Sequence, residues 1–237
     1  MQNRVIYDNN GMNLSFKSYA SKVFGFVALG LLISAGVSFL VALNFNAVFG
    51  ALASLGTFGL LLPTILEIVV AVYFSARLMS MRKSTAYICY FLYAILTGLT
   101  FSTIFFSFTL SDITFAFVST TVLFICMAVL GNNTNIDLTK ASGYLSAGLI
   151  SIIISTLLNV FIFKSSGFDL IISYVAVIIF LVLIAYDMQM LRNLYNAGLN
   201  DGGLYEKLLI FGSFQLYLDF INLFLRILSI FSRRRRD

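Results

Sequence analysis

The last apolar stretch of the chain, Leu208 to Phe231, constrains the fold more than any other feature. It is long enough to cross a bilayer, because about 20 helical residues at ~1.5 Å each span the ~30 Å hydrocarbon core. Asp219 lies near its middle, and Asn222 and Arg226 follow at helical spacing, so the three side chains share one face. A carboxylate at that depth is costly unless it is paired, neutralised or hydrated. The sequence therefore predicts a central helix with the other spans packed around its polar face.

The composition is that of an all-α membrane protein. Of the 237 residues 60% are hydrophobic and only 11% are charged, whereas about a quarter of the residues in soluble domains are charged. We expect one transmembrane domain, residues 23–231, between a cytoplasmic N-terminal tail, residues 1–22, and a basic C-terminal tail, residues 232–237. The net charge of +5 lies in tails and loops. It therefore indicates orientation in a lipid bilayer rather than nucleic-acid binding.

Seven apolar runs are predicted to form a bundle of seven transmembrane helices. The first run is too long for the core of a signal peptide, so we expect it to remain as a span. The predicted spans are roughly Val23–Phe45, Phe58–Met79, Ala86–Phe108, Ile113–Leu130, Leu145–Phe163, Leu170–Leu191 and Leu208–Phe231.

The distribution of basic residues predicts the orientation of the bundle. Lys and Arg gather in the N-terminal tail and in the loops after spans two, four and six, whereas the loops after spans one and three have none. This alternation places the N-terminus in the cytoplasm. Seven crossings then place the C-terminus outside, which conflicts with the basic tail Arg233–Arg236. Either the tail is an exception or one run does not cross fully, and the alternation of the loops favours seven crossings.

Three acids lie well inside apolar runs: Glu67, Asp187 and Asp219. The chain contains no histidine, which excludes histidine-based metal sites, Ser/His triads and histidine pH switches. Any proton chemistry near neutral pH must therefore use carboxylates.

Asp187 and Asp219 belong to consecutive spans that are expected to be antiparallel. If helix six continues to about Ala197, both carboxyl groups lie ~15 Å deep at ~1.5 Å per residue and face each other. If the helix stops at Leu191, their depths differ and the pairing weakens. Two carboxylates in contact cannot easily both ionise, so we expect a shared proton that titrates near neutral pH. Fully ionised, the pair suits a hard cation such as Ca²⁺.

Structural roles are open alternatives for the same residues. The aspartates are equally explained as links between helices, hydrogen-bonded to neighbours. Glu67 either joins the site or pairs with Arg77, and Arg226 either pairs with a carboxylate or extends to the interface. The candidate hydrogen-bond neighbours of the aspartates are Asn222, Tyr186, Tyr217 and Gln189.

Two motifs give the chain a resemblance to a known family. LYLDFINLFLRIL at Leu216–Leu228 follows AYDMQMLR at Ala185–Arg192 in the right order and at the right spacing, and TILEI at Thr64–Ile68 also fits. From about Ser15 to Ile230 the chain resembles the Bax inhibitor-1 (transmembrane Bax inhibitor motif) family. Its short tails and loops are more similar to bacterial than to animal members, which implies an inner-membrane location.

The resemblance implies a seven-helix bundle whose last helix is enclosed by the other six, and a pH-sensitive Ca²⁺ leak. It places the family's aspartate pair on Asp187 and Asp219 and its span-two glutamate on Glu67. The family also has a span-two arginine that acts as a latch toward the aspartates. Arg77 and Arg82 flank the matching position, and Arg77 is our choice.

Two functions of different classes follow. In the first, the protein is a calcium-leak channel in which Asp187 and Asp219 sense protons and bind Ca²⁺, Glu67 lines the ion pathway, and Arg77, with Arg226, acts as a latch. In the second, it is a membrane interaction protein that restrains a membrane protease or a cell-death factor, without transport. We expect no enzymatic activity, since the Gly-Asp type motifs of intramembrane aspartyl proteases are absent around both aspartates. No cofactor is expected beyond calcium as a permeant or bound ion.

Overall fold

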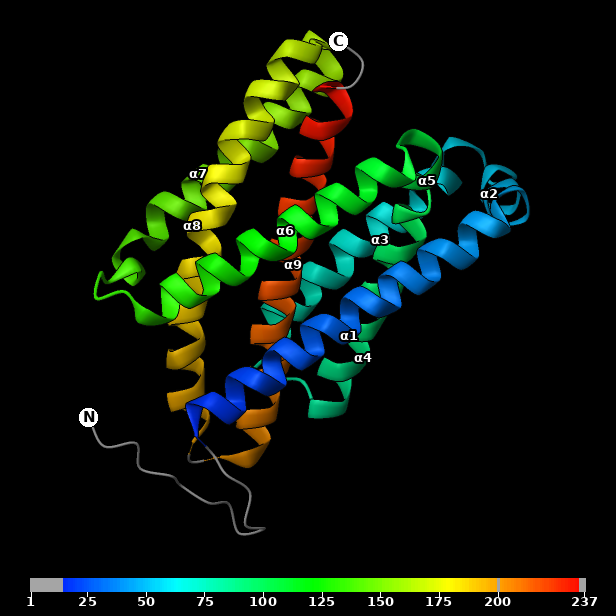
Figure 1. The fold of residues 1–237 in the computed structure, drawn as a ribbon. Coiled ribbons are helices and arrows are strands. Elements are labelled where there is room, and N and C mark those ends of the chain that lie inside the picture. Colours follow the sequence, from blue (N-terminus) through cyan, green and yellow to red (C-terminus); the bar gives the residue numbers. More distant parts are fainter. Residues whose placement is uncertain (1–14, 200, 235–237) are drawn as a thin grey trace. The chain divides into compact units, whose positions relative to one another are not determined.

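The computed structural model describes residues 15–199 and 201–234, and these are almost entirely helical, with no strand among them (Figure 1). Seven helical segments in the described part are long and apolar enough to cross a membrane, which confirms the predicted all-α bundle of seven spans. Most of the predicted N-terminal tail and the end of the basic C-terminal tail lie outside the described residues.

The helices in chain order are α1 (Phe16–Leu43), α2 (Phe45–Ala53), α3 (Gly56–Arg77), α4 (Lys83–Phe101), α5 (Ile104–Ser107), α6 (Leu110–Asn133), the 3-10 turn η1 (Leu138–Ala141), α7 (Ser142–Leu158), the π turn η2 (Asn159–Phe163), α8 (Ser166–Gly198) and α9 (Gly202–Arg234).

Two helices extend beyond the apolar runs that predicted them. α1 begins at Phe16, inside the predicted tail, because the Ser15 side chain accepts a hydrogen bond from the Ser18 amide and so caps the first turn. α8 continues through the polar segment after Leu191 as far as Gly198. Hydropathy locates the part of a helix that lies in lipid, whereas caps and turns decide where the helix begins and ends.

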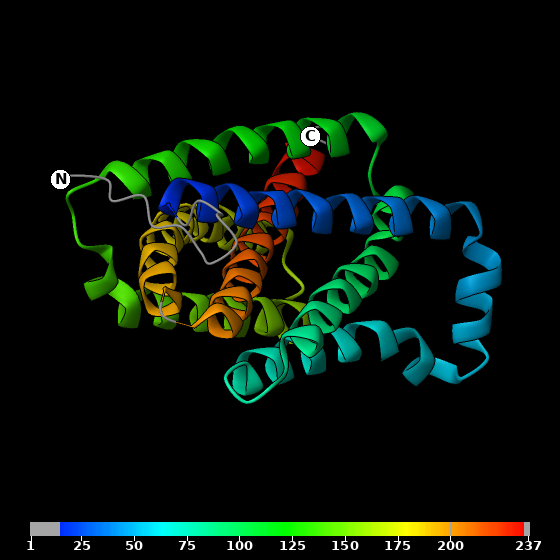
Figure 2. The same ribbon diagram turned by 90° about the horizontal axis from the view of Figure 1, so that it is seen from below.

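The chain divides into two compact units, of which the first comprises residues 1–107 and 193–217. α1 and α4 make the most extensive contact in this unit. Small residues permit it: a Cβ atom at Gly98 of α4 would lie only 2.7 Å from the Ser34 carbonyl oxygen of α1. α2 contacts both α1 and α3 and carries the chain from one to the other (Figure 2).

The first half of α9 contacts three helices of this unit. Tyr217 bonds to Ser34 of α1, and Phe214 packs edge-on against Phe74 of α3 and Tyr93 of α4.

The second unit comprises residues 108–192 and 218–237. α6 approaches α8 closely at Gly131, where a Cβ atom would lie 2.3 Å from the Ala185 carbonyl oxygen. α7 lies against α8 at Gly148 and Ile179. The second half of α9 contacts α6 through an edge-on pair of Phe220 and Phe124.

α9 is the most buried of the seven spans. In its most apolar window 72% of the residues are buried, compared with between 17% and 39% in the other spans. It is also the least apolar of the seven. Because lipid offers no hydrogen-bonding partner to polar side chains, the least apolar helix is the one that the others enclose. The predicted central position of the C-terminal helix is therefore confirmed.

Candidate functional site

The structure brings Asp187 of α8 and Asp219 of α9 together within the second unit. Their carboxyl groups lie close enough to interact with each other. Asp219 is only 7% exposed and Asp187 is half-buried. The continuation of α8 to Gly198 decides between the two alternatives for helix six in favour of the longer helix.

The pair lies in an apolar environment. Ile184 and Met188 flank Asp187 on α8 and are buried, and Phe220, which follows Asp219, packs edge-on against Phe117. One carboxyl oxygen of Asp219, Oδ2, is buried and accepts no hydrogen bond from a described residue. This oxygen is therefore available to a proton, a water molecule or a cation.

A hydrogen bond between two carboxyl groups has a specific chemical requirement. An ionised carboxylate is only an acceptor, so one of the two groups must carry a proton to donate. Removing that proton leaves two negative charges in contact, where the low local dielectric makes their repulsion strong. Two carboxyl groups in contact can share one proton, or, when both are ionised, can offer several oxygens to a hard cation.

Among the described residues, no further acidic side chain completes a metal cage around the aspartates. In the described part of the chain, no group of three or more Asp, Glu, His or Cys side chains is placed to hold a metal ion. A cation at the pair would need water or hydroxyl oxygens for the rest of its ligands. Calcium sites with few charged ligands bind weakly.

Glu67 lies on α3 in the first unit and is half-buried. Its Oε1 accepts a hydrogen bond of 2.8 Å from Thr100 Oγ1 of α4. Arg77, the last residue of α3, is exposed, and it forms no ion pair within residues 15–199 and 201–234. Of the two alternatives for Glu67, pairing with Arg77 is therefore not observed. Arg77 belongs to the first unit and the aspartates to the second, so its role as a latch stays a prediction.

Arg226 is half-buried on α9, two turns after Asp219. Its Nη2 donates to Thr156 Oγ1 of α7 at 3.0 Å, and the acid with which it interacts electrostatically is Asp169 at the start of α8. Arg226 thus connects α9 with the end of α7 and the start of α8, and its predicted role as a latch for the aspartate pair stays a prediction.

Comparison with known proteins identifies the family. A family model described as "Inhibitor of apoptosis-promoting Bax1" matches residues 16–236. The chain belongs to the Bax inhibitor-1 family. The inner membrane protein YbhL of Escherichia coli is 36% identical over 220 residues, which cover 92% of this chain and 93% of YbhL. A protein of Borreliella burgdorferi is 37% identical over 219 residues, covering 92% and 93% of the two chains, and one of Rickettsia prowazekii is 32% identical over 227 residues, covering 96% and 94%.

These matches confirm the resemblance that the two motifs predicted. Together with the seven apolar helices, they show that this Bax inhibitor-1 family member is a multi-pass integral membrane protein. It is therefore in contact with the lipid bilayer.

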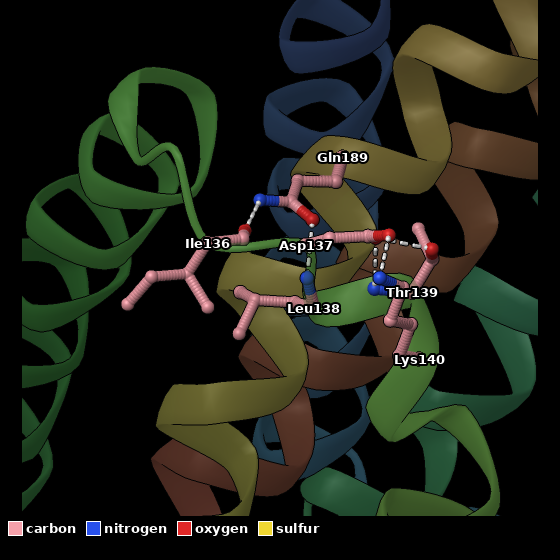
Figure 3. Close-up of polar contacts among 6 residues, drawn as sticks. All are labelled: Ile136, Asp137, Leu138, Thr139, Lys140 and Gln189. Atoms are coloured by element: carbon pink, nitrogen blue, oxygen red, sulfur yellow. Dashed lines mark hydrogen bonds and ion pairs between the residues drawn. The ribbon is translucent and has the colours of Figure 1, made fainter.

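Gln189 is a residue of this Bax inhibitor-1 family chain whose role sequence reasoning missed. It was a candidate partner for the aspartates, but it lies two residues after Asp187 on α8 and binds the loop between α6 and α7 instead (Figure 3). Its Nε2 donates to the Ile136 carbonyl oxygen at 2.7 Å, and its Oε1 accepts from the Leu138 amide at 2.8 Å. The loop is thereby fastened to the helix that carries Asp187. A lone glutamine near the end of a span gives no sequence signal for such a role.

Asp137 orders the same loop, and its charge predicts a pH dependence. The hydrogen bond from the Thr139 hydroxyl lowers the pKa of this exposed carboxyl below its ordinary value of 3.8, with further contributions from the Thr139 amide and Lys140. A lowered pKa stabilises the folded loop above the ordinary value, and this contribution is lost as pH falls through the lower, folded value. We expect hydrogen-exchange protection of the Thr139 amide, corrected for intrinsic rates, to fall below about pH 4.

The control for this prediction is Asp137→Asn, which has no charge to lose in this range. Protection in that variant should be independent of pH. An equal loss of protection in both proteins would contradict the role of the Asp137 carboxylate.

Proposed function

We propose that this protein is a pH-sensitive calcium-leak channel, gated by the Asp187–Asp219 pair, which titrates near neutral pH. The observation that carries the proposal is the proximity of two carboxyl groups on two membrane-spanning helices, one of them on α9, the most buried span. Ionisable groups inside a membrane mark ion or proton pathways by default. No histidine is present to sense protons in their place.

Gating follows from the two protonation states of the pair. With one proton bound, the hydrogen bond between the carboxyl groups ties α8 to α9. When the proton leaves, the two charges repel, and the pair either separates or takes up a cation. Protons and Ca²⁺ therefore compete for the same oxygens. Because no third acid joins the pair in the described part of the chain, we expect weak binding of Ca²⁺, which suits transit rather than storage.

The other polar residues singled out in the sequence also have proposed roles. Glu67 is half-buried between helices of the first unit and lines the ion path. Arg77 and Arg226 are the cations proposed to act as latches, by holding a carboxylate when the channel is closed. For Arg226 the bond to Thr156 is the contact that such a movement would break. The name of the relative YbhL supports placement in a bacterial inner membrane.

Calcium entry into liposomes that contain the purified protein is the experiment that tests this function. We expect entry above that of protein-free liposomes, with a rate that changes several-fold between about pH 5 and about pH 8, the range in which a shared proton leaves the pair. Absence of entry at every pH would refute the channel. It would favour the interaction protein, for which crosslinking in membranes should then recover a protease or another membrane protein.

A further inference from the structure

A second group of oxygen atoms converges inside the first unit, apart from the aspartate pair. It comprises the Glu67 carboxylate of α3, the Thr97 and Thr100 hydroxyls of α4 and the Tyr217 hydroxyl of α9. α3 and α4 are both far from α9 in the chain, so only the tertiary fold brings the four groups together. The group contains one carboxylate and otherwise neutral oxygens.

Thr97 is the residue that makes this group unusual. Its side chain is 2% exposed and lies within interaction range of Glu67, Tyr93 and Tyr217. Nevertheless its hydroxyl oxygen makes no well-formed hydrogen bond to any described residue. A buried hydroxyl without such a bond costs about 1–3 kcal/mol. A buried hydroxyl without such a bond, beside the Glu67 carboxylate, is a candidate ligand for a cation.

The surrounding bonds hold these oxygens in place. The Tyr217 hydroxyl is fully buried and lies 2.7 Å from Ser34 Oγ of α1, which in turn lies 2.7 Å from the Ala94 carbonyl oxygen of α4. Thr100 Oγ1 holds Glu67 Oε1 at 2.8 Å. The ligands are thus fixed by bonds to α1 and α4 before any partner binds.

We propose that Glu67, Thr97, Thr100 and Tyr217 form a binding site for a small monovalent cation, with Na⁺ as the ion that fits it. The charge of the site decides the class of ligand. One carboxylate balances one positive charge, whereas a divalent ion would leave an uncompensated charge in the membrane interior. Hard cations take carboxylate and hydroxyl oxygens as ligands. The site is distinct from the aspartate pair, whose two carboxylates suit Ca²⁺.

This inference does not depend on calcium transport. A cation that ties α3, α4 and α9 together binds the folded state and therefore stabilises it by mass action. Stability measurements alone test the sodium site, whereas calcium flux tests the channel.

The test is the thermal unfolding of the purified protein in detergent, with NaCl exchanged for N-methylglucamine chloride at constant ionic strength. We expect the melting temperature to rise with Na⁺ concentration and to reach a plateau. Glu67→Gln and Thr97→Val should each lose this rise, and CaCl₂ at equal ionic strength should not reproduce it. Each variant is compared with itself in N-methylglucamine, so a lower starting stability does not confuse the result.

Two controls make the result specific. Thr120→Val removes a buried hydroxyl from α6 of the second unit, which donates to the Ala116 carbonyl oxygen of its own helix, and should keep the full sodium effect. Asp219→Asn should keep it too, which separates this site from the aspartate pair. A wild-type melting temperature that does not respond to Na⁺, or an equal response in Thr97→Val and Thr120→Val, would overturn the proposal.

Discussion

Asp219→Asn is expected to abolish the pH dependence of calcium entry. At every pH, the rate of calcium entry through the variant should equal the wild-type rate at about pH 5. Asparagine has nearly the shape of a protonated aspartic acid but carries no proton that can leave. Its amide can still donate to Asp187, so the contact between α8 and α9 persists. The wild-type rate should change several-fold between about pH 5 and about pH 8, and the variant should give a flat line.

Asp187→Asn should give the same flat response, and the double variant should add nothing to either single one. When two residues titrate as one pair, the effects of substituting each of them do not add. The matched control is Asp112→Asn, the same chemical change at another buried acid of the second unit, which bonds to Thr109 at the start of α6. The control should keep the wild-type profile. If Asp219→Asn keeps that profile too, the pair is a structural link between helices.

Gly131→Ala is expected to have the second-largest effect, because it drives α6 away from α8 beside the aspartate pair. The new Cβ atom would lie 2.3 Å from the Ala185 carbonyl oxygen and 2.6 Å from the Ala185 Cα atom, and backbone atoms cannot rotate away as a side chain can. Ala185 is two residues before Asp187. Overpacking of this kind costs about 1–3 kcal/mol, and we expect a clear fall in melting temperature together with a weakened pH response of calcium entry.

The control is Gly143→Ala on α7 of the same unit, where no atom lies within 4 Å of the new Cβ atom. Because alanine is favoured over glycine in a helix by about 1 kcal/mol, this variant should be as stable as the wild type or more stable. Equal melting temperatures for both variants would show that the contact between α6 and α8 can open without cost.

Much of the architecture was predictable because the bilayer imposes one length on every span. The seven apolar runs, the enclosed last helix and the aspartate near its centre follow from hydropathy and from the cost of a charge in hydrocarbon. The same argument found Asp187 and Asp219 as a pair, provided that helix six was long enough. The polar residues after Leu191 concealed that α8 continues to Gly198.

The partners of individual polar side chains were decided by the tertiary structure alone. Ser34 and Tyr217 are 183 residues apart in the chain and lie 2.7 Å apart in space, and Gln189 binds a loop rather than an aspartate. Periodicity shows which residues share one face of a helix, but it does not show how that helix is rotated against its neighbours. Small residues such as Gly98 and Gly131 set those rotations by letting backbones approach. The sequence alone therefore determined the spans and the buried acids, whereas helix packing decided which oxygen atoms face one another.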